Sequence, residues 1–135
     1  MYEVNLSIAQ DPGTKNWWLE LDGKYVGYFP AKLFSNLASA DGVGWGGRTR
    51  TPPGTPSPPM GSGHFPDSYD NRDHACYFRF VSFRDALGDE GPDRKQVKLF
   101  TDNSNCYDVE YYGYVPHLHV GHFLQFGGPG GNCDN

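Results

Sequence analysis

Apolar and polar residues alternate through the first thirty positions with the two-residue period of a β-strand. In YEVNLSIA the apolar side chains share one face: Tyr2, Val4, Leu6 and Ile8. This alternation predicts a half-buried antiparallel strand. WWLEL and KYVGYF predict the next two strands, and the Asp22–Gly23 pair between them is typical of a hairpin turn of the primed type. The segment therefore predicts a three-stranded meander.

The period changes to that of a helix over residues 30–40, PAKLFSNLASA. The apolar residues here form one stripe: Leu33, Phe34, Leu37 and Ala38. Pro30 suits a first helical turn, and Asp41–Gly42 suits a helix end. This segment predicts the one short helix of the chain.

Strand patterns return after residue 42. GVGWGGRTRT reads as a strand interrupted by glycines, and ACYFRFVSFR, QVKLFTD, CYDVEYYGYV and HFLQFGG predict further strands. Prolines over 52–59 predict a surface loop rather than a domain boundary, because both flanks have the same β character. The prediction is an all-β, antiparallel, sandwich-like fold with one short helix, as a single domain over residues 1–135.

Composition agrees with this fold and narrows the partners. Aromatic residues make up 16% of the 135 residues, and there are 18 glycines and 11 prolines, which suits short strands punctuated by turns. A net charge of -5 without a basic tract argues against nucleic acid or an anionic membrane as a partner. No apolar run is long enough to span a bilayer, no signal peptide is visible in MYEVNLSIAQ, and no cofactor is implied.

Cysteines give a first indication of the compartment. Three cysteines allow one disulfide and one free thiol. A bond between Cys106 and Cys133 would close the last segment and would indicate an oxidising environment. Cys76, within CYFRFVSF, is more often a small buried thiol than a reactive one. Asn5 begins the tripeptide NLS, a glycosylation sequon if the protein is secreted.

Candidate chemical groups are weak when each is considered alone. His117 and His119 would share one strand face and could bind a metal as a pair, and His122 would lie on the opposite face unless Gly121 forms a bulge. No Cys, Asp or Glu at ligand spacing stands beside them, so no metal is predicted. Ser62 in GSGH lacks the strand-to-helix context of a nucleophile elbow. Glutamates on polar strand faces do not select a catalytic pair by spacing: Glu3, Glu20 and Glu110.

Aromatic residues are more numerous than a small core requires. The set is Trp18, Trp45, Tyr107, Tyr111, Tyr112 and Tyr114. Core packing is the usual role of such residues, but aromatics on a sheet face also bind extended peptides or sugars.

Several blocks, taken in order, resemble the C-terminal part of the neprosin domain, a family abundant in plants. The blocks are NWWLELDGKYVGYFPAKLFSNLASADGVGWGG, MGSGHF, YFRF, CYDV and FGGPGGNC. The resemblance implies a secreted, all-β domain related to acid-active glutamic peptidases that cut next to proline. In that family two glutamates act as base and acid.

One glutamate is expected directly after Trp-Gly-Gly, where this sequence has Arg48. The other belongs to the N-terminal half of the domain, and this chain is expected to begin after it. A guanidinium cannot act as acid or base, so the resemblance implies a non-catalytic protein. The candidate groove for proline-rich peptides comprises Trp45, Gly46, Gly47, Ser62 and His64.

Two alternatives remain open: an active glutamic endopeptidase that cuts next to proline, and a cell-wall carbohydrate-binding or defence module. If Arg48 and Arg50 line a cleft, an anionic ligand is favoured. The resemblance also implies a Cys106–Cys133 disulfide, with Cys76 free. A domain that lacks strands would leave an open sheet edge, so we expect either a second copy that covers this edge or a single sheet with the 30–40 helix packed on it.

Overall fold

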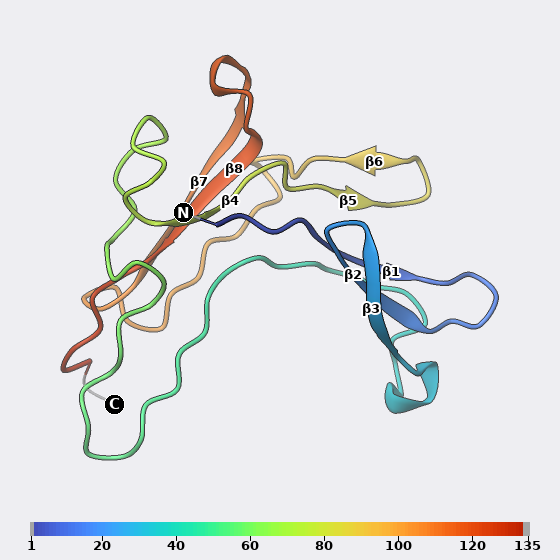
Figure 1. Ribbon diagram of the computed structural model, residues 1–135, viewed down its shortest axis with the longest axis horizontal. Coiled ribbons are helices and arrows are strands. Elements are labelled where there is room, and N and C mark those ends of the chain that lie inside the picture. The colour runs from blue at the N-terminus through green and yellow to red at the C-terminus, as the bar shows by residue number, and fades with distance from the viewer. Residues whose placement is uncertain (1, 134–135) are drawn as a thin grey trace. The chain divides into compact units, whose positions relative to one another are not determined.

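The computed structural model describes residues 2–133. Its contacts divide the chain into two compact units, Met1–Val43 and Gly44–Asn135, and each unit is described by itself (Figure 1). The single domain expected over residues 1–135 concerns both units together and stays a prediction. No helix among residues 2–133 has the length and apolar character needed to cross a membrane.

The first unit contains the predicted meander. It consists of β1 (Leu6–Gln10), β2 (Trp17–Leu21) and β3 (Lys24–Phe29), antiparallel in the order β1-β2-β3. Asp22 and Gly23 have φ of 47° and 75°, so both central residues of the β2–β3 turn are left-handed. Such a pair defines the primed turn, and this prediction is confirmed.

The predicted half-burial of the first strand is wrong. The strand begins at Leu6, and the side chains of Leu6 and Ile8 are 53% and 59% exposed. Alternation sets the face on which these side chains lie, but burial requires a second layer. Within the described part of the first unit no element covers this face.

The predicted helix over residues 30–40 is also wrong. Only a short 3₁₀ turn forms, η1 (Ala31–Leu33), and Leu33 remains 63% exposed. An amphipathic helix of this length needs an apolar surface to pack against. The carbonyl oxygen of Leu37 instead accepts hydrogen bonds of 3.4 Å from the side chains of Gln10 and Trp17. The segment is therefore tied to the meander as a loop.

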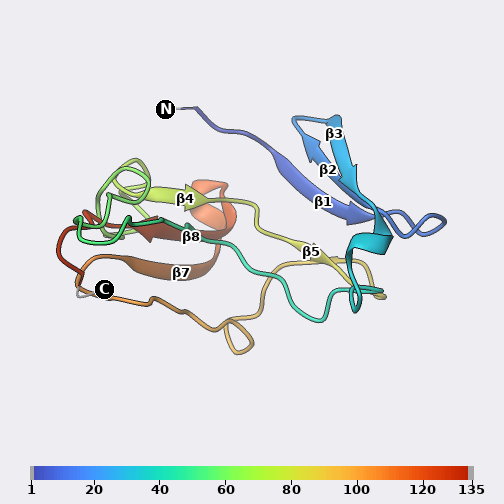
Figure 2. The same cartoon turned by 90° about the horizontal axis from the view of Figure 1, so that it is seen from below.

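The second unit is built on a three-stranded antiparallel sheet in the order β4-β8-β7 (Figure 2). Its strands are β4 (Cys76–Phe78), β7 (Asp108–Val115) and β8 (Gly121–Gly127), and a small hairpin pairs β5 (Phe83–Arg84) with β6 (Asp89–Glu90). A second 3₁₀ turn, η2 (Pro116–Leu118), connects β7 to β8. The strands predicted from CYDVEYYGYV and HFLQFGG are confirmed, as is the all-β, antiparallel class.

Three other predicted strands are corrected. ACYFRFVSFR is divided into β4 and β5 because Phe80 adopts a φ of 53°, which a strand cannot accommodate. QVKLFTD forms no strand, since the N–H groups of Gln96 and Val97 bond to the carbonyl of Asp93 in a turn. GVGWGGRTRT forms none either; it is held by side-chain packing instead of a hydrogen-bond ladder.

The buried core of the second unit is small and divided. Its clusters are Val81–Tyr111–Leu124, Val115–Val120–Phe123 and Cys106–Tyr107–Cys133. Most buried side chains come from β7, β8 and their flanking residues. These two strands therefore form the frame against which the loops of the candidate site pack.

Candidate functional site

The Trp-Gly-Gly-Arg segment has a defined place in the second unit. Trp45 packs against the Val81–Tyr111–Leu124 cluster. A Cβ atom added to Gly47 would lie 2.5 Å from Sδ of Met60 and 2.8 Å from Cε2 of Phe126, whereas one on Gly46 would meet open space. Only glycine fits at position 47 without a shift of its neighbours. Trp45 and Gly47 together therefore determine where Arg48 stands.

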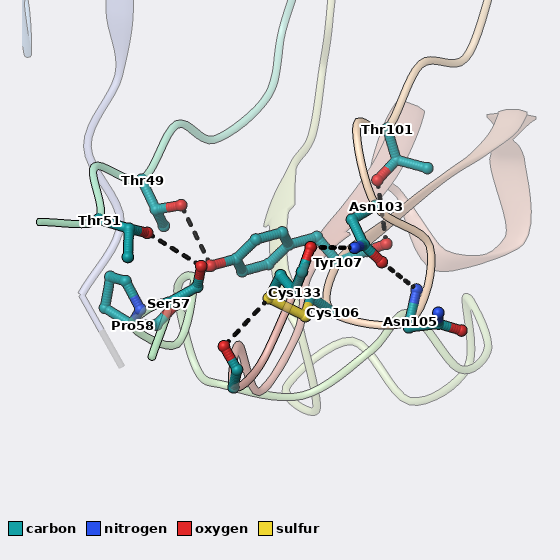
Figure 3. Close-up of a disulfide and its surroundings, with 11 residues drawn as sticks. Thr49, Thr51, Ser57, Pro58, Thr101, Asn103, Asn105, Cys106, Tyr107 and Cys133 are labelled. Carbon is teal, nitrogen blue, oxygen red and sulfur yellow. Dashed lines mark hydrogen bonds between the residues drawn. A yellow bond between two sulfur atoms is a disulfide. The ribbon is translucent and has the colours of Figure 1, made fainter. Parts of the chain in front are cut away.

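Arg48 is exposed on this segment, as is Arg50. Among residues 2–133, neither arginine forms a hydrogen bond or ion pair. The threonines that alternate with them point inward. Thr49 donates to the hydroxyl of Tyr107 over 3.2 Å, and Thr51 donates to Ser57 over 2.9 Å (Figure 3). The segment thus presents two unpaired cations to solvent.

The Cys106–Cys133 disulfide is present, as predicted, and it lies beside this segment. Tyr107, next to Cys106, connects the two, because its hydroxyl accepts the hydrogen bond from Thr49; the same hydroxyl donates to the carbonyl of Pro58 over 2.7 Å (Figure 3). Asn103 holds the tail through a 2.6 Å bond to the carbonyl of Cys133. Cys76 is free, as expected, and its side chain lies against Gly61.

Ser62 and His64 do not form a nucleophile and base. The hydroxyl of Ser62 donates to the carbonyl of His74 over 2.9 Å, and the ring of His64 lies 4.5 Å from the ring of His74 in a tilted arrangement. The MGSGHF loop approaches the Trp-Gly-Gly segment through Met60, which faces Gly47. No contact joins Ser62 or His64 directly to Trp45 in the described part of the chain, so their place in a common groove stays a prediction.

The geometry behind the histidine metal pair is wrong. His117 lies in η2 and His119 is left-handed with a φ of 51°, so they do not alternate along a strand; His122 lies on β8. Within residues 2–133, no three His, Cys, Asp or Glu side chains are placed to hold a metal.

The candidate carboxylates are divided between the units, with Glu3 and Glu20 in the first and Glu110 in the second. Glu110 accepts a 3.2 Å hydrogen bond from the hydroxyl of Tyr112, which also lies 2.9 Å from Oε1 of Gln125. Burial raises the pKa of Tyr112 well above its usual range, and the charge of Glu110 raises it further. The tyrosine is therefore a hydrogen-bond donor at any working pH.

Sequence reasoning missed Gln125, a fully buried glutamine on β8. Its Oε1 accepts the N–H of Asp67 over 3.3 Å, and its Nε2 donates to the carbonyl of Asn71 over 3.0 Å. These bonds attach the 67–71 loop to the sheet. The available signal was a single polar residue within the apolar run FLQFGG.

In the first unit, Trp18 lies at the centre of an exposed aromatic cluster. Its ring lies 5.3 Å from that of Tyr25 and 4.8 Å from that of Tyr28, and these tyrosines are 71% and 50% exposed. A shallow recess beside the cluster is lined by Ala9, Gln10, Asp11, Pro12, Trp18 and Tyr25. The other predicted aromatics differ: Tyr107 and Tyr111 are buried, and Tyr114 is exposed.

The neprosin family model matches residues 1–129 of this chain, which is nearly its whole length. The chain belongs to the neprosin family. This finding agrees with the blocks that run from Trp17–Trp18 to the glycine-rich tail.

Proposed function

We propose that this neprosin-family chain is a non-catalytic protein that binds proline-rich polypeptides. The observation that carries the proposal is Arg48, which directly follows Trp45, Gly46 and Gly47. Gly47 is confined by Met60 and Phe126, so Arg48 cannot take its place in the segment. The family resemblance places a catalytic glutamate directly after Trp-Gly-Gly, and this supports Arg48 as the residue at the acid's position.

Arginine at that position removes the peptidase chemistry. Hydrolysis by glutamates needs one group that takes a proton from water and one that gives a proton to the leaving amine. A guanidinium remains protonated at any usable pH, and it has no lone pair with which to accept a hydrogen bond. Its exposure in the second unit also leaves it hydrated rather than poised to transfer a proton.

The cluster of Trp18, Tyr25 and Tyr28 supports the peptide part of the proposal. Polyproline segments bind to exposed aromatic grooves because the proline rings pack flat on the aromatic side chains and the polyproline backbone is already extended. The indole N–H of Trp18 has no partner among the described residues, so it is available to a peptide carbonyl. Aromatic rings also stack on sugars, so carbohydrate binding is the second candidate, supported by the same cluster.

The proposal extends to location and partners. The Cys106–Cys133 disulfide supports secretion, and Asn5 is exposed as a glycosylated residue must be. The exposed Leu6 and Ile8 support association with a second copy, which light scattering would detect. The expectation that neither nucleic acid nor membrane is a partner stays a prediction.

Cleavage of a proline-containing reporter peptide at mildly acidic pH tests the loss of catalysis. The wild-type chain is expected to be inactive, and Arg48→Glu is compared with Arg50→Glu, a matched change on the same segment. Activity in Arg48→Glu alone would support the acid's position at 48 and show that the remaining machinery is present. Cleavage by the wild-type chain would contradict the proposal.

Tryptophan fluorescence with a decaproline peptide tests binding. Tyr25→Ser should weaken the response, and Phe100→Ser, at an exposed aromatic residue of the other unit, should leave it unchanged. A response to cello-oligosaccharides but not to decaproline would favour the carbohydrate alternative.

A further inference from the structure

A shallow depression at the β7–β8 edge brings an arginine and a histidine together. It is lined by Pro92, Asp93, Arg94, Tyr112, Gly113, Tyr114 and His122. We propose that this depression binds a carboxylate group between Arg94 and His122, and that it binds this group more tightly when His122 is protonated. The family resemblance assigns no role to any of these residues.

The hydrogen bonds of the Tyr111 hydroxyl determine which nitrogen of His122 carries the proton. The hydroxyl of Tyr111 lies 2.6 Å from the carbonyl oxygen of Pro92 and 2.6 Å from Nδ1 of His122. A carbonyl can only accept, so the single hydroxyl proton goes to Pro92. Nδ1 of His122 must then donate to the tyrosine oxygen. In the neutral imidazole the proton is therefore on Nδ1, and Nε2 is an acceptor.

Tyr111 is suited to hold this arrangement. Burial raises its pKa, so the hydroxyl stays protonated through the range in which histidines titrate. Nε2 of His122 has no hydrogen-bond partner among residues 2–133. Protonation of the ring therefore converts Nε2 from an acceptor, which repels a carboxylate oxygen, into a donor that binds one.

Arg94 is held in place before any ligand arrives. One terminal nitrogen donates to the carbonyl of Tyr112 over 2.8 Å, with a longer contact of 3.4 Å to that of Tyr111. The side chain crosses Gly113, where an added Cβ would lie 3.0 Å from Nε of Arg94. Gly113 stands in the β7 bulge with a φ of 79°. The guanidinium is thus fixed by backbone groups, with other N–H groups available to a ligand.

The charges around the depression favour an anionic ligand when His122 is protonated. The charged and titratable groups that line it or contact the His122 ring are Asp93, Arg94, Tyr111, Tyr112 and Tyr114. The charges of Asp93 and Arg94 offset one another while His122 is neutral. Protonation of His122 leaves one net positive charge. Gly91 lies over one face of the His122 ring, beside Cδ2 and Nε2, where an added Cβ would overlap the ring, so only glycine fits at this position.

Nuclear magnetic resonance of ¹⁵N-labelled histidine tests the proposal in the wild-type chain. The five histidines are assigned with the variant His122→Gln. At about pH 8, His122 is expected to show the Nδ1–H tautomer; the Nε2–H tautomer would overturn the proposal. N-acetylglycine supplies the carboxylate probe, and N-acetylglycinamide is its uncharged match.

N-acetylglycine is expected to bind at about pH 5.5 and to bind about tenfold more weakly at about pH 8, whereas the amide should not bind. Arg94→Gln should weaken binding at the lower pH about tenfold, and Arg72→Gln, on an exposed loop, should not change it. Equal responses to acid and amide, or no saturable binding at about pH 5.5, would overturn the proposal. The wild-type comparison of acid and amide decides the question even if Arg94→Gln fails to fold.

Discussion

Loss of the Cys106–Cys133 disulfide should destabilise the second unit by several kcal/mol. The bond joins residues separated by 27 positions. The chain-entropy model for a loop of that length assigns about 3.5 kcal/mol to the restriction of the unfolded chain. The folded tail keeps its other contacts when the bond is removed, because Asn103 still bonds to the carbonyl of Cys133, and Gly128 and Gly131 still bridge to Met60 and Ser57. The loss should therefore be close to the entropy term.

Urea unfolding of the double variant Cys106→Ala/Cys133→Ala measures this loss. Trp45 packs in the core of the second unit, so its fluorescence reports that unit when Trp17 and Trp18 are replaced by Phe in every sample. Cys76→Ala, which removes the free thiol but leaves the disulfide, is the control. A decrease in the free energy of unfolding below about 1 kcal/mol would refute the reasoning, since the disulfide would then not restrict the unfolded chain as the loop length requires.

Two further predictions concern the packing and the titration of the second unit. Gly47→Ala should lower the free energy of unfolding by about 1–3 kcal/mol, because the added methyl group would overpack against Met60 and Phe126. Gly46→Ala is the control and should be nearly neutral, because its methyl group would meet open space. Equal losses for the two variants in urea unfolding would contradict the packing argument. The pKa of Tyr112 is raised in the folded chain, so as the pH rises this tyrosine loses its proton in the unfolded chain first, at about pH 10. The free energy of unfolding therefore keeps its full contribution from Tyr112 below that pH and declines as the pH rises further. The decline should be smaller in Tyr112→Phe, and an identical pH dependence in the variant would show that this tyrosine is not its source.

Local pattern was sufficient wherever the physical cause is itself local. The alternation of WWLEL and KYVGYF, with Asp22–Gly23 between them, predicts the hairpin because strand period and turn backbone are properties of neighbouring residues. The same holds for β7 and β8. The pattern gave a wrong prediction over residues 30–40. Its apolar stripe has helical spacing but no surface to pack against, so the segment forms a loop that is hydrogen-bonded to the meander.

The candidate site shows the same division. The sequence by itself determined that an arginine follows Trp-Gly-Gly and that this side chain can act neither as an acid nor as a base, because a guanidinium stays protonated whatever its surroundings. Which cysteines pair followed from family resemblance, and the structure confirmed it.

Only the tertiary structure decided what depends on partners distant in the chain. It brings Pro92 and Tyr111 to His122 and so determines which nitrogen carries the proton, and it surrounds Gln125 with the polar groups of a distant loop. It also leaves Leu6 and Ile8 without cover in their own unit. Burial, tautomer and hydrogen-bond satisfaction are properties of an environment, and residues that are far apart in sequence create that environment.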